Sequence, residues 1–406
     1  MARCLIVAAS TAFGSTTSGD AAPLALHDAV SSPRTSAYSG AMPFDVRDFP
    51  GAPPEDRATG RRNRRLVATW LFVVAGMILV MVVLGGLTRL TGSGLSIMEW
   101  APISGILPPL DHADWEQLFR LYQRIPQYAL LHKGFGLAGF QHIFWLEWAH
   151  RLWGRLIGVV FLGPLIWFWA TGRLERRLRP WLLLLFLLGA LQGVVGWFMV
   201  ASGFSPDATA VSPYRLVVHL GLALCLYAAI VWTGLTVLRP APAHRPRTFR
   251  LRRLAFACCT LVVLTILAGG FVAGTHAGYD YNSFPLMDGH LVPSGYARLT
   301  PFLRNLTENV AAVQFDHRLL ATLTALVTAC TVALGFAAPA PLDVRLPLAA
   351  LGLTTAVQYG LGVATLLLVV PPGLAAAHQA NAVLVLTAAL VLLHGLRRPR
   401  PLAAEA

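Results

Sequence analysis

Long apolar runs, separated by polar and arginine-rich stretches, dominate the chain. Eight of these runs reach the length of about 20 mostly apolar residues that a helix needs to cross a bilayer. They cover residues 66–88, 143–170, 180–201, 213–237, 254–275, 309–336, 345–369 and 373–395. The pattern predicts an all-α, polytopic membrane protein with eight transmembrane helices.

Composition supports this prediction and excludes other classes. Of the 406 residues, 56% are hydrophobic and only 13% are charged, which excludes an ordinary soluble domain. The formal net charge of +13 is high enough for a nucleic-acid-binding protein. The basic residues stand beside the apolar runs instead of forming one basic face, however, and we therefore expect no nucleic-acid partner.

Arginines cluster at alternate ends of the predicted spans. Clusters precede the first span, separate the second from the third and the fourth from the fifth, and follow the eighth: Arg61, Arg62, Arg64, Arg65; Arg173, Arg176, Arg177, Arg179; Arg239, Arg245, Arg247, Arg250, Arg252, Arg253; Arg397, Arg398, Arg400. Because Lys and Arg gather in cytoplasmic loops, the pattern predicts a multi-pass protein with both termini in the cytoplasm.

The N-terminal region contains no sustained apolar run. Residues 1–60 are rich in Ala, Ser, Gly and Pro, which is typical of a disordered tail. Asp20 and Asp28 argue against a mitochondrial presequence, which is normally poor in acids. We therefore expect the bacterial inner (plasma) membrane, with the mitochondrial inner membrane as the alternative. Met42 is a plausible start of a shorter product that lacks residues 1–41.

Two halves of the chain carry similar residues at corresponding places. The matched positions are Gly85-Gly86 with Gly269-Gly270, His150-Arg151-Leu152 with His317-Arg318-Leu319, Gln192 with Gln358, and His219 with His378. Four spans in each half give both halves the same orientation, so the repeat is parallel. The sequence predicts two parallel-repeat four-helix bundles flanked by a disordered N-terminal tail and a short C-terminal tail: residues 1–60, 61–240, 241–397 and 398–406.

Histidines stand at four of the repeat positions, at similar depth in the second and fourth span of each half. They are His150 and His219 in the first half, and His317 and His378 in the second. Facing side chains of a helix bundle build cofactor sites, and a pair of His suits the two axial positions of a heme iron. Zinc or copper is the competing metal, but supporting ligands at this depth are too few. The sequence predicts one heme site in each half.

A carboxylate distinguishes the first half from the second. Glu147 precedes His150 by three residues and therefore lies on the same helix face. The second half has Asp316 directly beside His317, where it points elsewhere. An ionisable group at membrane depth is a functional hypothesis, so we expect Glu147 to be catalytic. A largely apolar site would favour the neutral form of its carboxyl group.

Four arginines lie within about a turn of the histidines and are candidate contacts for heme propionates. They are Arg151, Arg155, Arg215 and Arg318. The alternative is that they extend toward lipid phosphate. The loop of residues 89–142, with an amphipathic stretch from Trp115 to Tyr128, is long enough to cap a pocket. The simplest interpretation of the loop from Thr275 to Thr307 is a polar lid.

Several long motifs, in order along the chain, resemble those of the heme A synthase family. They are GGLTRLTGSGLS at 85–96, EWAPISG at 99–105, EWAHR at 147–151, THAG at 275–278, NSFPLM at 282–287, FDHR at 315–318 and HQAN at 378–381. The resemblance covers residues 62–397. Some members carry cysteine pairs in external loops, whereas the cysteines of this chain lie outside its long loops, so it resembles the proteobacterial and mitochondrial type.

The resemblance implies an oxidoreductase that converts the C8 methyl group of heme O to a formyl group in two successive hydroxylations, giving heme A for cytochrome oxidase. By position, His150 and His219 would hold the substrate heme O and Glu147 would be the catalytic residue. A permanent heme b would be ligated by His317 and His378. A heme O synthase is the implied partner, the electron acceptor is unknown, and a homo-oligomer stays open.

Two other classes share part of this pattern. A bis-His diheme electron-transfer cytochrome, such as a quinol-linked membrane subunit, would use the same four histidines but would not need Glu147. A transporter would explain the repeat but should not retain a heme. Heme content after purification separates the transporter, and analysis of the heme products separates the electron carrier.

Overall fold

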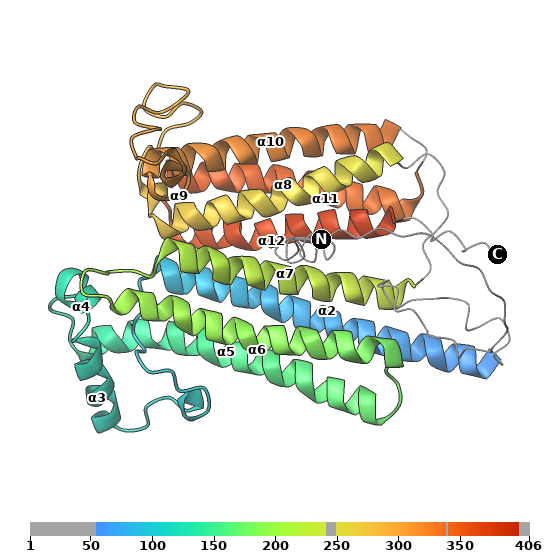
Figure 1. Ribbon diagram of the computed structural model, residues 1–406, viewed down its shortest axis with the longest axis horizontal. Helices are drawn as coiled ribbons and strands as arrows, with labels where there is room; N and C mark the ends of the chain where they lie inside the picture. Colours follow the sequence, from blue (N-terminus) through green and yellow to red (C-terminus); the bar gives the residue numbers. More distant parts are fainter. Residues whose placement is uncertain (1–53, 241–248, 338–339, 398–406) are drawn as a thin grey trace, which may run out of the picture. The chain divides into compact units, whose positions relative to one another are not determined.

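The computed structural model describes residues 54–240, 249–337 and 340–397, and over these residues the regular elements are all helical. Eight of the helices are long and apolar enough to cross a membrane. They are α2 (Pro54–Leu90), α5 (Leu137–Ala170), α6 (Arg179–Ala201), α7 (Pro213–Leu238), α8 (Phe249–Gly274), α10 (Val310–Ala337), α11 (Leu342–Leu367) and α12 (Pro372–Gly395) (Figure 1). The predicted all-α, multi-pass membrane protein is confirmed.

Local sequence explains where several spans begin. Proline occupies one of the first positions of α6, α7 and α12. A backbone N–H in the first turn of a helix has no acceptor within that helix, so the N–H that proline lacks costs no hydrogen bond there. The φ angle that its ring fixes is also close to the helical value. The apolar runs that follow then propagate each helix across the membrane, because only hydrogen-bonded backbone is tolerated there.

The helix α2 begins earlier than the sequence pattern predicted. Its first residue is Pro54, so residues 54–60 are helical, although we expected them in a disordered tail. The rest of the predicted tail, residues 1–53, and the predicted tail at 398–406 lie outside the described residues.

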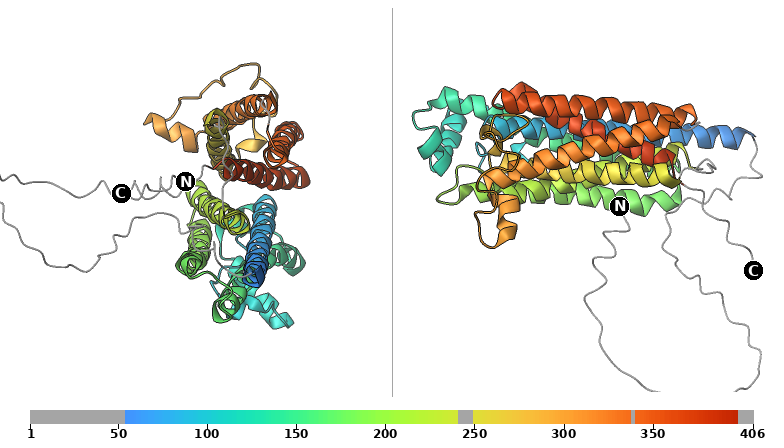
Figure 2. Two further views of the ribbon diagram at one scale, coloured as in Figure 1. Left: turned by 90° about the vertical axis from the view of Figure 1, so that its right-hand side faces the viewer. Right: turned by 90° about the horizontal axis from the view of Figure 1, so that it is seen from above.

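The spans gather in two groups in chain order. In the first group α2 contacts α5 and α7, while α6 contacts the same two helices. In the second, α8 contacts α10 and α12, and α11 also contacts both. Contacts of α7 with α8 and of α12 with α2 join the groups, which lie side by side when viewed along the helices (Figure 2). The parallel repeat remains a prediction.

Connections between the spans form a structured cap at one end of the bundle, which we call the loop end. The α2–α5 connection holds α3 (His112–Tyr122) and α4 (Pro126–Leu131), in agreement with the predicted amphipathic stretch. Buried Tyr122 packs there against Phe140 at the start of α5. The α8–α10 connection contains η5 (Ala277–Tyr279), η6 (Phe302–Arg304) and α9 (Asn305–Glu308).

The main apolar core of the spans lies on the other side of the histidines. It includes Leu71 of α2, Leu182 of α6, Leu348 of α11 and Leu386 of α12, all fully buried. In every span that contributes to this cluster, its buried members lie between the level of the histidines and the end of the bundle opposite the loop end. The four histidines themselves are only half-buried.

Candidate functional site

Glu147 is buried beneath the loop that follows α2. Its side chain is 3% exposed. One carboxylate oxygen, Oε2, accepts hydrogen bonds from the Ser96 hydroxyl at 2.7 Å and from the Ile97 backbone N–H at 2.9 Å. The other, Oε1, accepts from Arg151 Nη2 at 2.7 Å and Nε at 3.1 Å. The immediate surroundings of the Glu147 carboxylate are therefore polar, and these donors suit its ionised form.

The second half places a carboxamide at the corresponding position. Gln314 precedes His317 by three residues and is 2% exposed. Its Nε2 donates to the backbone carbonyls of Ala277 and Asp280, at 2.6 and 2.5 Å. Its Oε1 accepts from Arg318 Nη2 at 2.7 Å, the distance that also separates Arg151 Nη2 from Glu147. Both halves thus pair the residue three positions before the histidine with an arginine, but only the first half has a carboxylate there.

The predicted histidines come together in pairs. The imidazoles of His150 and His219 lie close enough to interact electrostatically, and so do those of His317 and His378. Each ring packs against a glycine of a neighbouring helix. A Cβ added to these glycines would lie 2.9–3.0 Å from a ring atom, in the pairs Gly85 with His150, Gly196 with His219, Gly269 with His317 and Gly362 with His378.

Neighbouring groups orient three of the four imidazoles. His317 Nδ1 lies 3.1 Å from the Thr265 carbonyl, which accepts its N–H and leaves Nε2 free as a ligand. The Gln192 amide lies 3.1 Å from His219 Nδ1, and the Gln358 amide lies at the same distance from His378 Nδ1. These amides fix the rings in matching ways in the two halves.

The residues present fit a heme better than a metal ion held by protein ligands alone. Among the described residues, three or more His, Cys, Asp or Glu side chains nowhere gather as a metal site. Two imidazoles supply two ligands, and the remaining positions on iron have to come from a porphyrin. The glycines let each imidazole pack closely against a neighbouring helix, and the buried members of the main apolar core do not extend to this level. Heme is the ligand that this donor set suits.

Each of the four arginines that we predicted to contact propionates already donates hydrogen bonds to backbone carbonyls of the protein. Arg151 and Arg155 donate to carbonyls of the α2–α5 connection, and Arg318 donates to carbonyls of the α8–α10 connection. Arg215 lies 3.8 Å above the Phe198 ring and donates to its carbonyl. Arg155 Nη1 and Arg318 Nε are buried without a hydrogen-bond partner, so each side chain retains a donor. Propionate binding remains a prediction.

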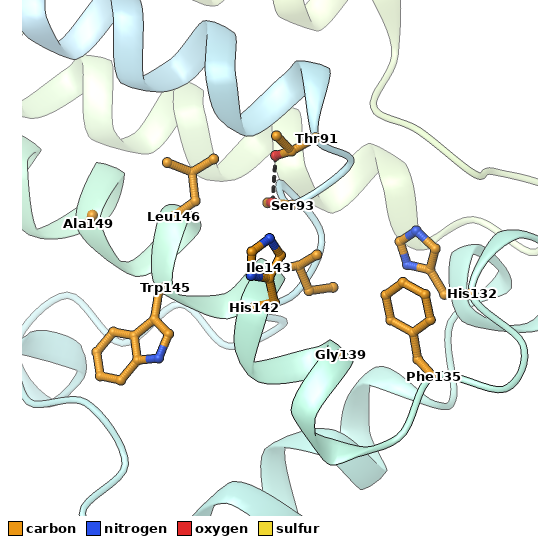
Figure 3. A pocket seen from close by; sticks show the side chains of 10 residues that line it. All are labelled: Thr91, Ser93, His132, Phe135, Gly139, His142, Ile143, Trp145, Leu146 and Ala149. Atoms are coloured by element: carbon orange, nitrogen blue, oxygen red, sulfur yellow. Dashed lines mark hydrogen bonds between the residues drawn. The ribbon is translucent and has the colours of Figure 1, made fainter. Parts of the chain in front are cut away.

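A cavity of about 740 Å³ opens at the loop end beside this site (Figure 3). It is lined by Ser93, by His132 and by the first turns of α5, including His142. Burial lowers the pKa of His132, whose ring hydrogen-bonds to the Tyr122 hydroxyl. Burial, and secondarily the charge of Glu147, raise the pKa of Tyr122. The α2–α5 connection thus lines a pocket, as its length suggested.

Two contacts join the halves near the histidines. Gln379, the residue after His378, donates from Nε2 to the Val82 carbonyl of α2 at 3.0 Å. A Cβ on Gly86 would lie only 1.8 Å from Gln379 Oε1, so any other side chain here would displace the Gln379 amide. Arg89 Nη2 donates to the Ala273 carbonyl at 3.0 Å and contacts His276 Nε2 at 2.6 Å.

Comparisons with known proteins agree with the sequence motifs. Residues 68–390 match the cytochrome oxidase assembly protein family. The chain belongs to this family. It is 61% identical to the heme A synthase of Granulibacter bethesdensis over 337 residues, which are 83% of this chain and 89% of that relative. It is 50% identical to the heme A synthase of Rhodospirillum centenum over 351 residues, covering 86% and 92% of the two chains. The resemblance to heme A synthases is confirmed.

Sequence reasoning missed several residues of this family member's site. Gln314 was overlooked beside the more conspicuous Asp316, which accepts a hydrogen bond from Tyr296 at 2.8 Å. A signal for it existed, because Glu147 and Gln314 have the same spacing to their histidines. The glycines that face His219 and His378 carried a signal too, since each stands four residues after a glutamine, in Gln192–Gly196 and Gln358–Gly362. Nothing in the sequence pattern indicated the Ser96 contact.

Proposed function

We propose that this chain is a heme A synthase, which oxidises the C8 methyl group of heme O to a formyl group. Two successive hydroxylations would give an alcohol and then a gem-diol that loses water. The observation that carries the proposal is the asymmetry of the two halves. Beside the first histidine pair lies the buried carboxylate of Glu147, and beside the second lies the neutral Gln314. The relatives that share most of the sequence bear the name heme A synthase.

The two histidine pairs then have different tasks. His150 and His219 would hold heme O as the substrate, next to Glu147. His317 and His378 would hold a permanent heme b, whose bound iron supplies one-electron chemistry. The Thr265 carbonyl supports the second assignment, because it holds the His317 ring in the tautomer that a stable axial ligand needs.

Glu147 acts as a fixed negative charge and a proton carrier. Its four hydrogen bonds occupy about as many acceptor sites as a carboxylate offers. A charge held in this way stabilises positive charge that develops beside it without reorganisation. Of the donors, only the Ser96 hydroxyl can also accept a proton, so a proton that leaves or reaches Glu147 passes through Ser96 Oγ.

The same proposal includes the setting of the enzyme. The arginine clusters support a bacterial inner membrane protein with both termini in the cytoplasm. Its substrate carries an isoprenoid chain, so a prenyl-transferring heme O synthase is the partner that has to supply it. Membership of the cytochrome oxidase assembly protein family supports a role of the product in the terminal oxidase.

Heme extraction and chromatography test this function. Wild-type protein and the Glu147→Gln variant would be purified from cells that also make heme O. We expect heme A with wild type, and heme O or a hydroxylated intermediate with the variant. Heme b alone in both proteins would instead indicate an electron-transfer cytochrome. Ser93→Ala is a matched control, because Ser93 is buried in the same loop but bonds Thr91 rather than Glu147.

A further inference from the structure

The segment from Ile97 to Leu110, in the α2–α5 connection, is mostly apolar yet largely exposed, and Glu99 is its one charged residue. Its side chains include Ile103, Leu107 and Leu110, which are 81%, 68% and 77% exposed. The segment has no regular structure except the short helix η2 (Ser104–Ile106). A contiguous apolar surface of this kind is a liability in water and marks a site of interaction.

Two arginines of α5 satisfy the backbone of this segment. Arg151 donates from Nη2 to the Ile97 carbonyl at 2.5 Å and from Nη1 to the Glu99 carbonyl at 2.7 Å. One turn further along α5, Arg155 continues the series. It donates from Nη2 to the Ala101 carbonyl at 2.7 Å and from Nε to the Pro102 carbonyl at 2.9 Å. The two guanidinium groups thus donate the hydrogen bonds that water would otherwise give to these four carbonyls.

Helix geometry gives the depth of these contacts. Arg155 lies 15 residues before Ala170, the end of α5, and Val194 lies 15 residues after Arg179, the start of the neighbouring α6. Arg155 is therefore level with Val194, which is seven residues from the end of α6 at Ala201. At 1.5 Å per residue this is roughly 10 Å inside the end of the helix.

The level of Arg155 and Val194 lies within the hydrocarbon of the bilayer. The 23 residues of α6 measure about 35 Å, only slightly more than the hydrocarbon thickness of roughly 30 Å. An aromatic contact gives the same placement independently, because Trp100 stacks on Trp197 of α6 with ring centroids 5.0 Å apart. Part of the α2–α5 connection lies alongside α5 rather than beyond its end (Figure 1).

The second half lacks the corresponding anchor. Arg318 also donates to two carbonyls of its connection, those of Tyr281 and Ser283. The position that matches Arg155, five residues after the histidine, is however Thr322, whose hydroxyl bonds to its own helix and to Tyr359. Among the two connections, the deep arginine contact is therefore particular to the one between α2 and α5.

We infer that residues 100–106 are the deepest part of a re-entrant segment and lie within the hydrocarbon of the leaflet at the loop end, with lipid acyl chains as their partner. Irregular backbone is tolerated at membrane depth only where protein groups satisfy it. Here Arg151 and Arg155 satisfy four carbonyls, those of Ile97, Glu99, Ala101 and Pro102. Gly105 allows the close approach, since a Cβ there would lie 3.1 Å from Arg155 Nη2. Because Ile97 also bonds Glu147, lipid bounds this side of the carboxylate site.

Spin-label accessibility in phospholipid nanodiscs tests the inference. A nitroxide would be attached to cysteine at position 103, in full-length protein whose own cysteines are replaced by alanine. Two labelled positions serve as references: Leu187, an exposed residue in the apolar middle of α6, and His112 in α3, whose side chain is 76% exposed. We expect relaxation at 103 to be enhanced by oxygen and not by the aqueous reagent nickel-EDDA, as at 187. Accessibility to nickel-EDDA equal to that at 112 would overturn the inference.

A second variant tests the arginine anchor without removing its charge. Arg155→Lys keeps a cation but cannot reach two carbonyls with a planar pair of donors. We expect the label at 103 to become more accessible to nickel-EDDA in this variant, while the label at 187 keeps its wild-type values and shows that the spans remain inserted. An unchanged label at 103 would contradict anchoring by Arg155.

Discussion

The carboxylate of Glu147 and the carboxamide of Gln314 occupy matching positions, and the surroundings of each suit only its own chemistry. Around Glu147 all three neighbouring groups, the Ser96 hydroxyl, the Ile97 N–H and the Arg151 guanidinium, donate, which a carboxylate can satisfy. Around Gln314 two groups are carbonyl oxygens and one is a guanidinium, which requires a donor and an acceptor on one side chain. The charge asymmetry of the two halves is therefore specified by backbone as well as by side chains.

Gln314→Glu should destabilise the protein. The new carboxylate oxygen would face the carbonyls of Ala277 and Asp280, which now accept hydrogen bonds from the amide. Leaving buried acceptors unpaired costs about 1–3 kcal/mol each, so we expect a lower thermal midpoint in detergent. Gln314→Met, which removes the polar group but adds no charge, is the control. A Glu variant at least as stable as the Met variant would contradict this account.

Ser96→Ala should slow turnover and alter its pH dependence. The hydroxyl donates to Glu147 at 2.7 Å, and loss of a hydrogen bond to a charged group corresponds to a decrease of about 10- to 100-fold. A proton route through Ser96 also predicts a shifted pH profile and a changed solvent isotope effect. Conversion of heme O would be followed over a range of pH, with Ser93→Ala as control. A lower rate with the wild-type profile would leave Ser96 with a structural role only.

Removal of one histidine of the second pair should release the heme b that we propose it binds. We expect His378→Ala to lose most of its heme b, because His317 and His378 would hold the iron together. His394→Ala is a matched control, since His394 lies in the same helix, is 2% exposed and bonds Thr236 instead. The ratio of heme to protein in purified samples is the measurement. Retention of heme b by the first variant, or its loss from both, would count against the assignment of His378.

The sequence predicted the spans well and the loop contacts poorly, for physical reasons. A long apolar run can be recognised in the sequence without knowledge of its tertiary contacts. The fourth run predicted a helix at residues 213–237, and α7 is found at Pro213–Leu238. The histidine pairs followed from the internal repeat. The partners of Glu147 did not, because Ser96 and the Ile97 N–H belong to irregular backbone whose path is fixed only by tertiary contacts. The same holds for the carbonyls that Arg155 binds.

Gly86 and Gln379 should be energetically coupled across the two halves. Gly86→Ala would displace the Gln379 amide and so cost its bond to the Val82 carbonyl, worth about 0.5–1.5 kcal/mol. Gln379→Ala alone loses the bond to the Val82 carbonyl, worth about 0.5–1.5 kcal/mol. With the small side chain at 379 the added methyl group fits, so the double variant should be more stable than the sum of the single effects predicts. Additive changes in thermal unfolding would show that the halves are not coupled here.

The Arg89 and His276 contact should make stability depend on pH. Arg89 can only donate, so His276 Nε2 has to be unprotonated to accept at 2.6 Å. Burial, and then the charge of Arg89, lower the pKa of His276 below its ordinary value of 6.5. The unfolded chain therefore binds this proton more readily than the folded one. The stabilisation is complete above the unfolded pKa and is lost as the pH falls from there through the folded pKa.

The variant His276→Asn isolates this contribution. Asparagine tolerates the left-handed backbone of this residue, where φ is 58°, and its amide oxygen does not titrate. Thermal midpoints of wild type and variant would be compared at about pH 7.5 and about pH 5.5, on either side of the ordinary histidine pKa. We expect wild type to lose more stability between these values than the variant, because other titrating groups contribute equally to both. An equal loss in the two proteins would show that protonation of His276 does not oppose folding.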